Sequence, residues 1–335
     1  MQSKFQYATA AHQQGRLADA ERLYSEILHQ KPDHFDALHR LGIIAAQTGR
    51  VEQAVELIGK AISVNPTMAN AHYNLGNAFL QSKRPQDALA SYDKAIALKP
   101  DFADAYYNRG IALQHQKRSA EALVSYGKAI ALKPDFAEAH SNRGVLLLEQ
   151  RQLDDALASH DKALALKPEV AASHNNRGNA LQQLERPIDA LASYDRAIAL
   201  SPDYVAAYSN RGLALQDLNR PVEAFASYER AIAIDPEHAE AHNNRSQCLL
   251  QMGRYEEGWL EYEWRKRQSE PIAGRSYAQP LWRGEDIAGK ILFLWWEQGF
   301  GDTIQFCRYV KLAEARGARI ILSVQQPLFG LLTQI

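Results

Sequence analysis

Proline recurs at a fixed interval along most of the sequence, and this period restricts the possible folds more than any other feature. The interval is 34 residues, at Pro32, Pro66, Pro100, Pro134, Pro168, Pro202 and Pro236. A constant period of this length is typical of tandem helix–turn–helix repeats, in which each helix pair buries its apolar face on its neighbours. Proline lacks a backbone N–H and therefore stops the helix that precedes it. The spacing predicts an array of short helices without a single central core.

Small residues recur with the same period when repeat one is taken as residues 1–34. The eighth position is glycine at Gly42, Gly76, Gly110, Gly144, Gly178 and Gly212, and the twentieth is alanine at Ala20, Ala54, Ala88, Ala122, Ala156, Ala190 and Ala224. Small side chains at such points let two helices approach closely, while larger residues fill the remaining space. The larger residues are Tyr92, Tyr126, Tyr194 and Tyr228.

The segment AHYNLGNAFLQSKRPQDALASYDKAIALKPDF, residues 71–102, resembles the tetratricopeptide repeat consensus. It is especially similar to the repeats of the large protein O-linked N-acetylglucosamine transferases and their bacterial relatives. The resemblance covers residues 1–268, as seven full repeats and a divergent eighth. It implies an all-α superhelical solenoid with a concave surface that binds a protein or peptide. The fold alone does not identify the partner, because the same scaffold serves many functions.

Asparagine occupies the sixth position of six successive repeats, and we call these residues the asparagine row: Asn74, Asn108, Asn142, Asn176, Asn210 and Asn244. At about 100° per residue, position 6 lies about 160° from the glycine position, on the open face of the helix. An asparagine side chain offers a donor and an acceptor, which match a peptide unit. In the resembling transferases, asparagines at this position hold substrate peptide. Bonding to a neighbouring repeat is the structural alternative.

Two other polar residue types also recur. The arginine row comprises Arg109, Arg143, Arg177, Arg211 and Arg245 at position 7. These arginines either bind acidic partners or pair inside the scaffold with carboxylates such as Asp93, Asp161 or Asp195, and we favour internal pairing. His72, His140, His174 and His242 recur at position 4, one per repeat and not at metal-ligand spacing. We therefore expect packing histidines and no metal site.

The eighth repeat departs from the pattern and ends in an aromatic and basic run: Trp259, Tyr262, Trp264, Arg265, Lys266 and Arg267. We interpret this run as a terminal cap that packs large rings and exposes a charged edge, in preference to a separate ligand site.

The sequence changes character after Gln268. Residues 269–289 show no helical periodicity and predict a linker. KILFLWW then predicts a buried strand, followed by a glycine-containing turn, a helix over about residues 303–317, a second strand at ARIILSV and a further helix after Pro327. This order predicts a short, incomplete α/β segment of Rossmann-like type over residues 290–335. In its turn, Gly299 and Gly301 could bring backbone N–H groups near a phosphate or sugar, or simply form a tight turn.

The segment EQGFGDTIQFCRYVKLAEARGARIILSVQQPL, together with EGWLEYEWR upstream, resembles bacterial proteins that join tetratricopeptide repeats to a heptosyltransferase-like glycosyltransferase of the GT-B type. In that class a Gly-Asp pair in this turn supplies a catalytic base, and Asp302 is the matching residue; a helix-capping role is the alternative. The resemblance also implies a nucleotide-sugar donor. Residues 290–335 represent only the start of such a domain, so we expect neither a cofactor nor glycosyl transfer in this chain alone.

Composition excludes several other classes. The formal net charge of −1 gives no basic surface for nucleic acid. Cys248 and Cys307 indicate a reducing compartment without disulfides, and neither a signal peptide nor a membrane span is recognisable. We therefore expect a cytoplasmic protein-interaction scaffold, and keep a protein or polysaccharide glycosyltransferase as the alternative.

Overall fold

A computed structural model describes residues 2–267, 279–280, 282–296 and 299–333. The chain divides into two compact units, 1–210 and 211–335, which are described separately below. Among the helices in the described ranges, none is long and apolar enough to cross a membrane.

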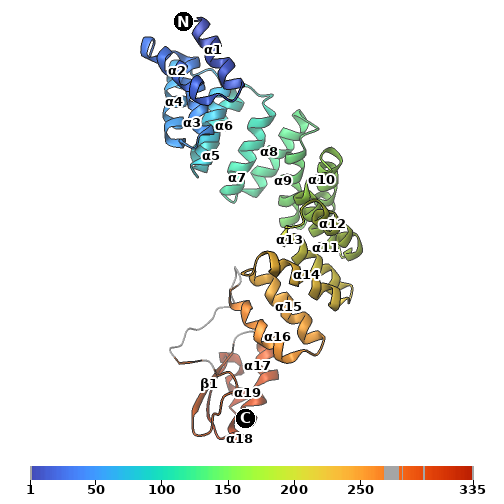
Figure 1. Ribbon diagram of the computed structural model, residues 1–335. Helices are drawn as coiled ribbons and strands as arrows, with labels where there is room; N and C mark the ends of the chain where they lie inside the picture. Colours follow the sequence, from blue (N-terminus) through green and yellow to red (C-terminus); the bar gives the residue numbers. More distant parts are fainter. Residues whose placement is uncertain (1, 268–278, 281, 297–298, 334–335) are drawn as a thin grey trace. The chain divides into compact units, whose positions relative to one another are not determined.

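The first unit is a succession of helix pairs, with two helices in each repeat. Its helices are α1 (Gln2–Gln13), α2 (Leu17–Gln30), α3 (Phe35–Gln47), α4 (Val51–Val64), α5 (Ala69–Gln81), α6 (Pro85–Leu98), α7 (Ala103–His115), α8 (Ser119–Leu132), α9 (Ala137–Glu149), α10 (Leu153–Leu166), α11 (Ala171–Gln183) and α12 (Pro187–Leu200). Helix α13 (Val205–Asp217) contains the boundary between the units. From α1 to α12, each helix packs on the next (Figure 1). The predicted all-α solenoid of helix–turn–helix repeats is confirmed.

The turn between the two helices of a repeat contains one residue in the left-handed region. This residue is glycine at Gly15, Gly49 and Gly253, but has a side chain at Lys83, Lys117, Arg151, Glu185 and Asn219. At Lys83 the turn is closed by the Arg84 N–H, which donates to the carbonyl of Phe79 at 2.8 Å. This bond satisfies a carbonyl that the helix end would otherwise leave free. Proline then opens the second helix at Pro85, Pro187 and Pro221, as expected for a residue without an N–H.

Four of the six recurring glycines lie against the recurring tyrosines, while Gly42 lies against Ile58 and Gly144 against His160. In repeat four, a Cβ added to Gly110 would stand 2.5 Å from Cε1 of Tyr126, a fully buried ring. Gly76 lies in the same way against Tyr92. Glycine is therefore required for the close approach of the two helices, as the spacing predicted.

We expect Gly110→Ala to destabilise the array by about 1–3 kcal/mol, because the buried Tyr126 ring has no room to move away from the new methyl group. Gly127→Ala is the matched control in the same repeat. A Cβ at Gly127 meets nothing within 4 Å, so alanine should stabilise helix α8 by about 0.5–1 kcal/mol. Urea unfolding measures both effects, and a shift of the two midpoints in the same direction would contradict this packing argument.

The second unit begins with the rest of the repeat array and ends in a small α/β segment. Its remaining repeat helices are α14 (Pro221–Ile234), α15 (Ala239–Gln251) and α16 (Tyr255–Tyr262), followed by the 3-10 helix η1 (Glu263–Arg267). The α/β segment contains β1 (Ile291–Trp295), α17 (Phe300–Cys307), α18 (Tyr309–Ala315), β2 (Arg319–Ser323), η2 (Gln326–Leu328) and α19 (Phe329–Leu332).

The predicted strand–helix–strand order is confirmed. Strands β1 and β2 pair in parallel, with Ile291 opposite Arg319 and Trp295 opposite Ser323. The helical part was misplaced, because it begins at Phe300 and divides at Arg308 into two short helices. It starts early because Gly299 adopts an extended conformation and its carbonyl accepts the N–H of Thr303 at 3.2 Å.

The predicted linker, residues 269–289, is only partly covered, since residues 269–278 and 281 lie outside the described ranges. Near its end, Ile287 is buried and packs with Ala313 and Ala318 in the core of the α/β segment. The residues just before β1 therefore belong structurally to that segment.

Candidate functional site

The asparagine row lies on the first helix of each repeat, and four of its members donate hydrogen bonds to the preceding repeat. Asn108 Nδ2 lies 3.0 Å from the Tyr73 hydroxyl and 2.9 Å from Asn77 Oδ1, and Asn142 Nδ2 lies 3.2 Å from the Tyr107 hydroxyl. The Nδ2 atoms of the other two have equivalent partners: Asn74 with His39, and Asn210 with Asn175 and Asn179. Bonding to a neighbouring repeat, the structural alternative, therefore occurs at these four positions.

The bond from Asn74 requires His39 to be neutral at Nε2, because only an unprotonated ring nitrogen accepts a hydrogen bond. The environment favours this state. Burial lowers the pKa of His39, and the neighbouring charge of Arg40 lowers it further.

The side-chain oxygens of the row are not used in these bonds. The six residues are half-buried, and among the described residues none of their Oδ1 atoms is both fully buried and without a hydrogen-bond partner. Asn108 and Asn210 each use their side-chain N–H groups in two bonds within the array. The row can therefore bind another molecule mainly through its amide oxygens, which are hydrogen-bond acceptors.

Asn176 differs from these four because its amide group is entirely free. Among the described residues, neither Asn176 nor Asn244 has a hydrogen-bond partner for its side chain. In repeat five, the positions that bind Asn108 or Asn210 in their preceding repeats are occupied by Ser141, which is shorter, and Val145, which is apolar. Asn176 therefore retains both a donor and an acceptor.

The arginine row is mostly engaged inside the scaffold, as we favoured. Arg109 Nε donates to Asp93 at 2.7 Å, and its Nη1 donates to Ser125 at 2.7 Å. Arg177 repeats the arrangement with Asp161 and Ser193, at 2.6 and 2.8 Å. Arg211 donates to Ser227 at 2.5 Å. Arg143 is the exception, because it makes no hydrogen bond or ion pair to another side chain in the described ranges.

The recurring histidines join successive repeats. Nε2 of His72, His140, His174 and His242 lies 2.9–3.1 Å from the carbonyl oxygen of the proline six residues earlier. Each bond ties the start of one repeat to the proline that ends the previous one. The packing interpretation is confirmed, and the described residues contain no cluster of ligands suited to a metal ion.

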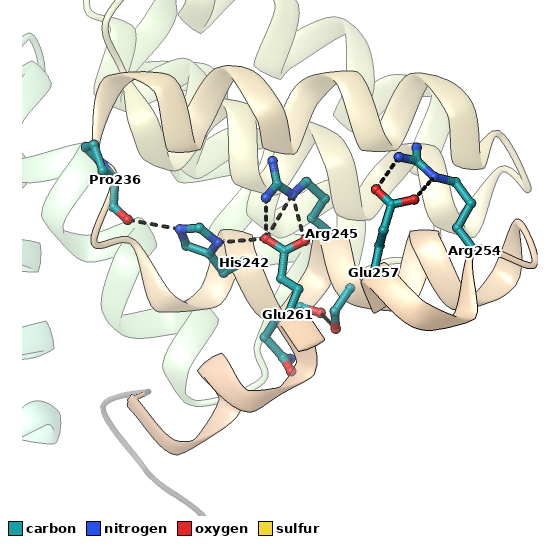
Figure 2. A network of polar contacts seen from close by, with 8 residues as sticks. Pro236, His242, Arg245, Arg254, Glu257 and Glu261 are labelled. Carbon is teal, nitrogen blue, oxygen red and sulfur yellow. Dashed lines mark hydrogen bonds and ion pairs between the residues drawn. The ribbon is translucent and has the colours of Figure 1, made fainter. Parts of the chain in front are cut away.

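The eighth repeat contains a polar network at its end (Figure 2). Glu261 accepts hydrogen bonds from the guanidinium of Arg245 and lies 2.7 Å from Nδ1 of His242. Trp264 stacks on His242 with ring centroids 3.8 Å apart, and the guanidinium of Arg267 lies over Trp264. Trp264 thus packs as expected of a cap, whereas Trp259 remains about half exposed.

The residues with a predicted role in the tail lie together at the start of α17. Gly299 caps the helix, while Gly301 and Asp302 lie in its first turn, and all three are exposed. Residues 297 and 298, which precede them, lie outside the described ranges. The side chain of Asp302 lies near the cap, since a Cβ on Gly299 would be 3.7 Å from its carboxylate oxygen.

Comparison with known proteins agrees with the period of the sequence and the helix pairs of the structure. Family models described as tetratricopeptide repeat match residues 6–63, 39–101, 73–135, 125–158, 169–237 and 227–259, which together make up more than half of the chain. The chain belongs to the tetratricopeptide repeat family. A search of curated proteins finds no sequence match.

Solved structures show the same tetratricopeptide fold. Pseudomonas aeruginosa pilF is 23% identical, with a TM-score of 0.57 over 64% of this chain and 97% of that one. A tetratricopeptide repeat protein from Parabacteroides merdae is 15% identical, with a TM-score of 0.54 over 74% of this chain and 98% of that one. MamA is 28% identical over 48% of this chain and 95% of its own, with a TM-score of 0.46. The family matches end at residue 259, so the glycosyltransferase resemblance of the tail stays a proposal.

Sequence reasoning missed the residues that hold the asparagine row of this tetratricopeptide array. The side-chain N–H groups of the row donate hydrogen bonds to residues at two positions of the preceding repeat. These are position 5, with Tyr73, Tyr107 and Asn175, and position 9, with Asn77 and Asn179. A partial signal was present at position 5, which is His39, Tyr73, Tyr107, Ser141 and Asn175 in successive repeats, but position 9 is apolar at Ile111 and Val145.

Proposed function

We propose that the first unit binds an extended polypeptide segment through Asn74, Asn108, Asn142, Asn176 and Asn210. The observation that supports this proposal most directly is the amide oxygen, one per repeat, which the bonds within the described part of the array leave unused at all five positions. Most of the other recurring polar side chains are occupied, since the histidines bond to prolines and Arg109 and Arg177 bond to carboxylates. The asparagine oxygens, by contrast, are available for binding in every one of these repeats.

An extended polypeptide suits this series of acceptors because its backbone carries one N–H group per residue. Bonds to backbone atoms depend little on the side chains of the partner. The internal bonds of Asn108 and Asn210 add to the fit, because a side chain held in place loses less conformational entropy when it binds. We therefore propose a site that is fixed in geometry and tolerant of sequence.

A neutral probe tests the proposal without knowledge of the natural partner. We suggest a fluorescein-labelled 15-residue peptide made of five Val-Thr-Gln units, with a second version N-methylated at alternate residues. N-methylation removes backbone donors and leaves the side chains unchanged. Fluorescence anisotropy should show binding of the first peptide and at least tenfold weaker binding of the second. Equal binding of the two would rule out recognition through asparagine oxygens.

We expect Asn176→Ala to weaken binding of the unmethylated peptide about five- to thirtyfold, the effect of losing one or two hydrogen bonds at about 1 kcal/mol each. This variant breaks no internal bond, because the Asn176 side chain has none in the described part of the chain. Its unfolding midpoint should therefore not fall below that of the wild type, and the higher helix propensity of alanine could raise it slightly. His174→Ala is the control, since it removes a bond that ties two repeats together but no acceptor of the row.

A second candidate function, glycosyl transfer, is supported by the arrangement of residues 291–323. Parallel strands β1 and β2 are joined by helices, and Asp302 lies in the first helical turn after β1. An exposed aspartate there could act as a base toward an acceptor hydroxyl, with a nucleotide sugar as donor. Because residues 290–335 alone are expected not to transfer sugar, the assay needs a protein in which a complete domain of this type contains them. Transfer of radiolabelled sugar to a protein acceptor by that protein, and its loss in Asp302→Asn, would support this function. No transfer, or transfer that Asp302→Asn leaves intact, would count against it.

A further inference from the structure

Arg143 differs from the other members of the arginine row because the position of its carboxylate partner holds no carboxylate. The two other members of the arginine row in the first unit each meet an aspartate sixteen residues earlier, Arg109 with Asp93 and Arg177 with Asp161. Sixteen residues before Arg143 the residue is Gly127. Arg143 therefore lacks the aspartate that pairs with Arg109 and Arg177, because Gly127 occupies that position.

The place left by the missing carboxylate is open. Gly127 lies inside helix α8, with an exposed surface, and a Cβ built on it meets no atom within 4 Å. In the flanking repeats, the aspartate that occupies this place lies within 2.7 Å of the arginine Nε. An external carboxylate could therefore reach Arg143 in the geometry that the scaffold already uses twice.

The charges around Arg143 are mixed, and none of the carboxylates is bonded to it. Lys162 adds a second positive charge nearby, because both Lys162 and Arg143 help to lower the pKa of His140, although burial is the larger cause. In repeat four, the charge of Arg109 contributes to lowering the pKa of Glu121, although the hydrogen bond from Arg118 is the largest cause. Asp155 occupies the position of Glu121 in the next repeat. Arg143 and Asp155 nevertheless form no ion pair, so the guanidinium has free N–H donors.

We propose that Arg143 binds a carboxylate side chain of the polypeptide partner, which therefore carries aspartate or glutamate where it meets repeats four and five. This inference rests on the proposed function, since Asn142, the neighbour of Arg143 in the chain, belongs to the asparagine row. The two side chains leave the same helix about 100° apart, so the proposal requires a partner on the row whose own side chain extends around the helix to Arg143. A guanidinium–carboxylate pair in this place is charge-assisted and geometrically specific.

Two probe peptides separate this inference from general peptide binding: the Val-Thr-Gln peptide described above and its Val-Thr-Glu counterpart. At low ionic strength, the wild type should bind the glutamate peptide about tenfold more tightly than the glutamine peptide. Arg143→Gln should abolish this preference and leave the affinity for the glutamine peptide unchanged. Arg177→Gln should keep the preference, because Arg177 is already neutralised by Asp161.

Gly127→Asp provides the sharpest variant, because it restores the carboxylate that the flanking repeats possess. It should abolish the glutamate preference and raise the unfolding midpoint, whereas Gly127→Ala should leave the preference intact. An equal affinity of the wild type for the two peptides, or a preference that survives in Arg143→Gln or Gly127→Asp, would overturn the inference. If only the preference is missing, the proposed peptide site stands; if neither peptide binds, both proposals fail.

Discussion

Replacing Glu261 by alanine is expected to lower the free energy of unfolding of the eighth repeat by about 3 kcal/mol, the cost of breaking a largely buried ion pair from one side. The Glu261 side chain is only 10% exposed and serves both Arg245 and His242 (Figure 2). Alanine would leave a guanidinium and an imidazole N–H without their acceptor in a partly buried place. Hydrogen exchange of the amides of α15 and α16 would measure the loss, which should not spread to repeats three to five.

Glu257→Ala is the matched control. Glu257 lies in the same helix and pairs with Arg254 at 2.6 Å, but both side chains are exposed (Figure 2). An exposed pair of this kind contributes little to stability, so the control should exchange like the wild type. If Glu261→Ala matched this control, the network would be shown to have no stabilising role.

Acidification is expected to destabilise the middle of the array through His160. This side chain is fully buried, and neither ring nitrogen has a hydrogen-bond partner in the described part of the chain. Burial lowers its pKa from 6.5 to about 4, against the weaker opposing effect of Asp161. The unfolded chain therefore binds the proton first as the pH falls. Stability due to His160 is complete above about pH 6.5 and declines until about pH 4, by about 3 kcal/mol in total.

His160→Phe isolates this effect because it removes the titrating group and keeps an aromatic ring against Gly144. Phenylalanine suits the site better than tyrosine. In repeat four the hydroxyl of Tyr126 bonds to Gln114, but the equivalent residue in repeat five is Leu148. His39 and His140, whose pKa values burial also lowers, titrate in both proteins. The difference between the two unfolding curves, measured from pH 8 to pH 4, should therefore report His160; parallel curves would contradict this assignment.

The fold was predictable from the sequence because its strongest constraint is periodic. A glycine such as Gly110 and a tyrosine such as Tyr126 recur in step, and the structure brings them into contact. The start of α17 was less predictable, because it depends on the backbone conformation of Gly299, which no residue pattern reveals.

The candidate site was predictable as a surface but not in its details. Helical geometry predicted an open face for the asparagine row, whose members are half-buried in the structure, but could not show that Asn108 gives both N–H groups to repeat three. That result depends on side-chain reach: a tyrosine or asparagine at position 5 extends far enough, whereas Ser141 does not. The isolation of Arg143 follows from a single substitution, Gly127, and is visible in sequence once the sixteen-residue pairing is known.

The constant separations between bonded side chains have a consequence for how such a gene can change. Asparagine partners lie 31 or 35 residues apart, and arginine partners 16 residues apart, so the bonds within the array join a repeat to itself or to the next one. Duplication or loss of one 34-residue unit would preserve these relations at the new junction. The length of the array can therefore change by whole repeats through duplication or deletion. A single point mutation, such as one in the codon for residue 127, instead changes the binding properties of one repeat.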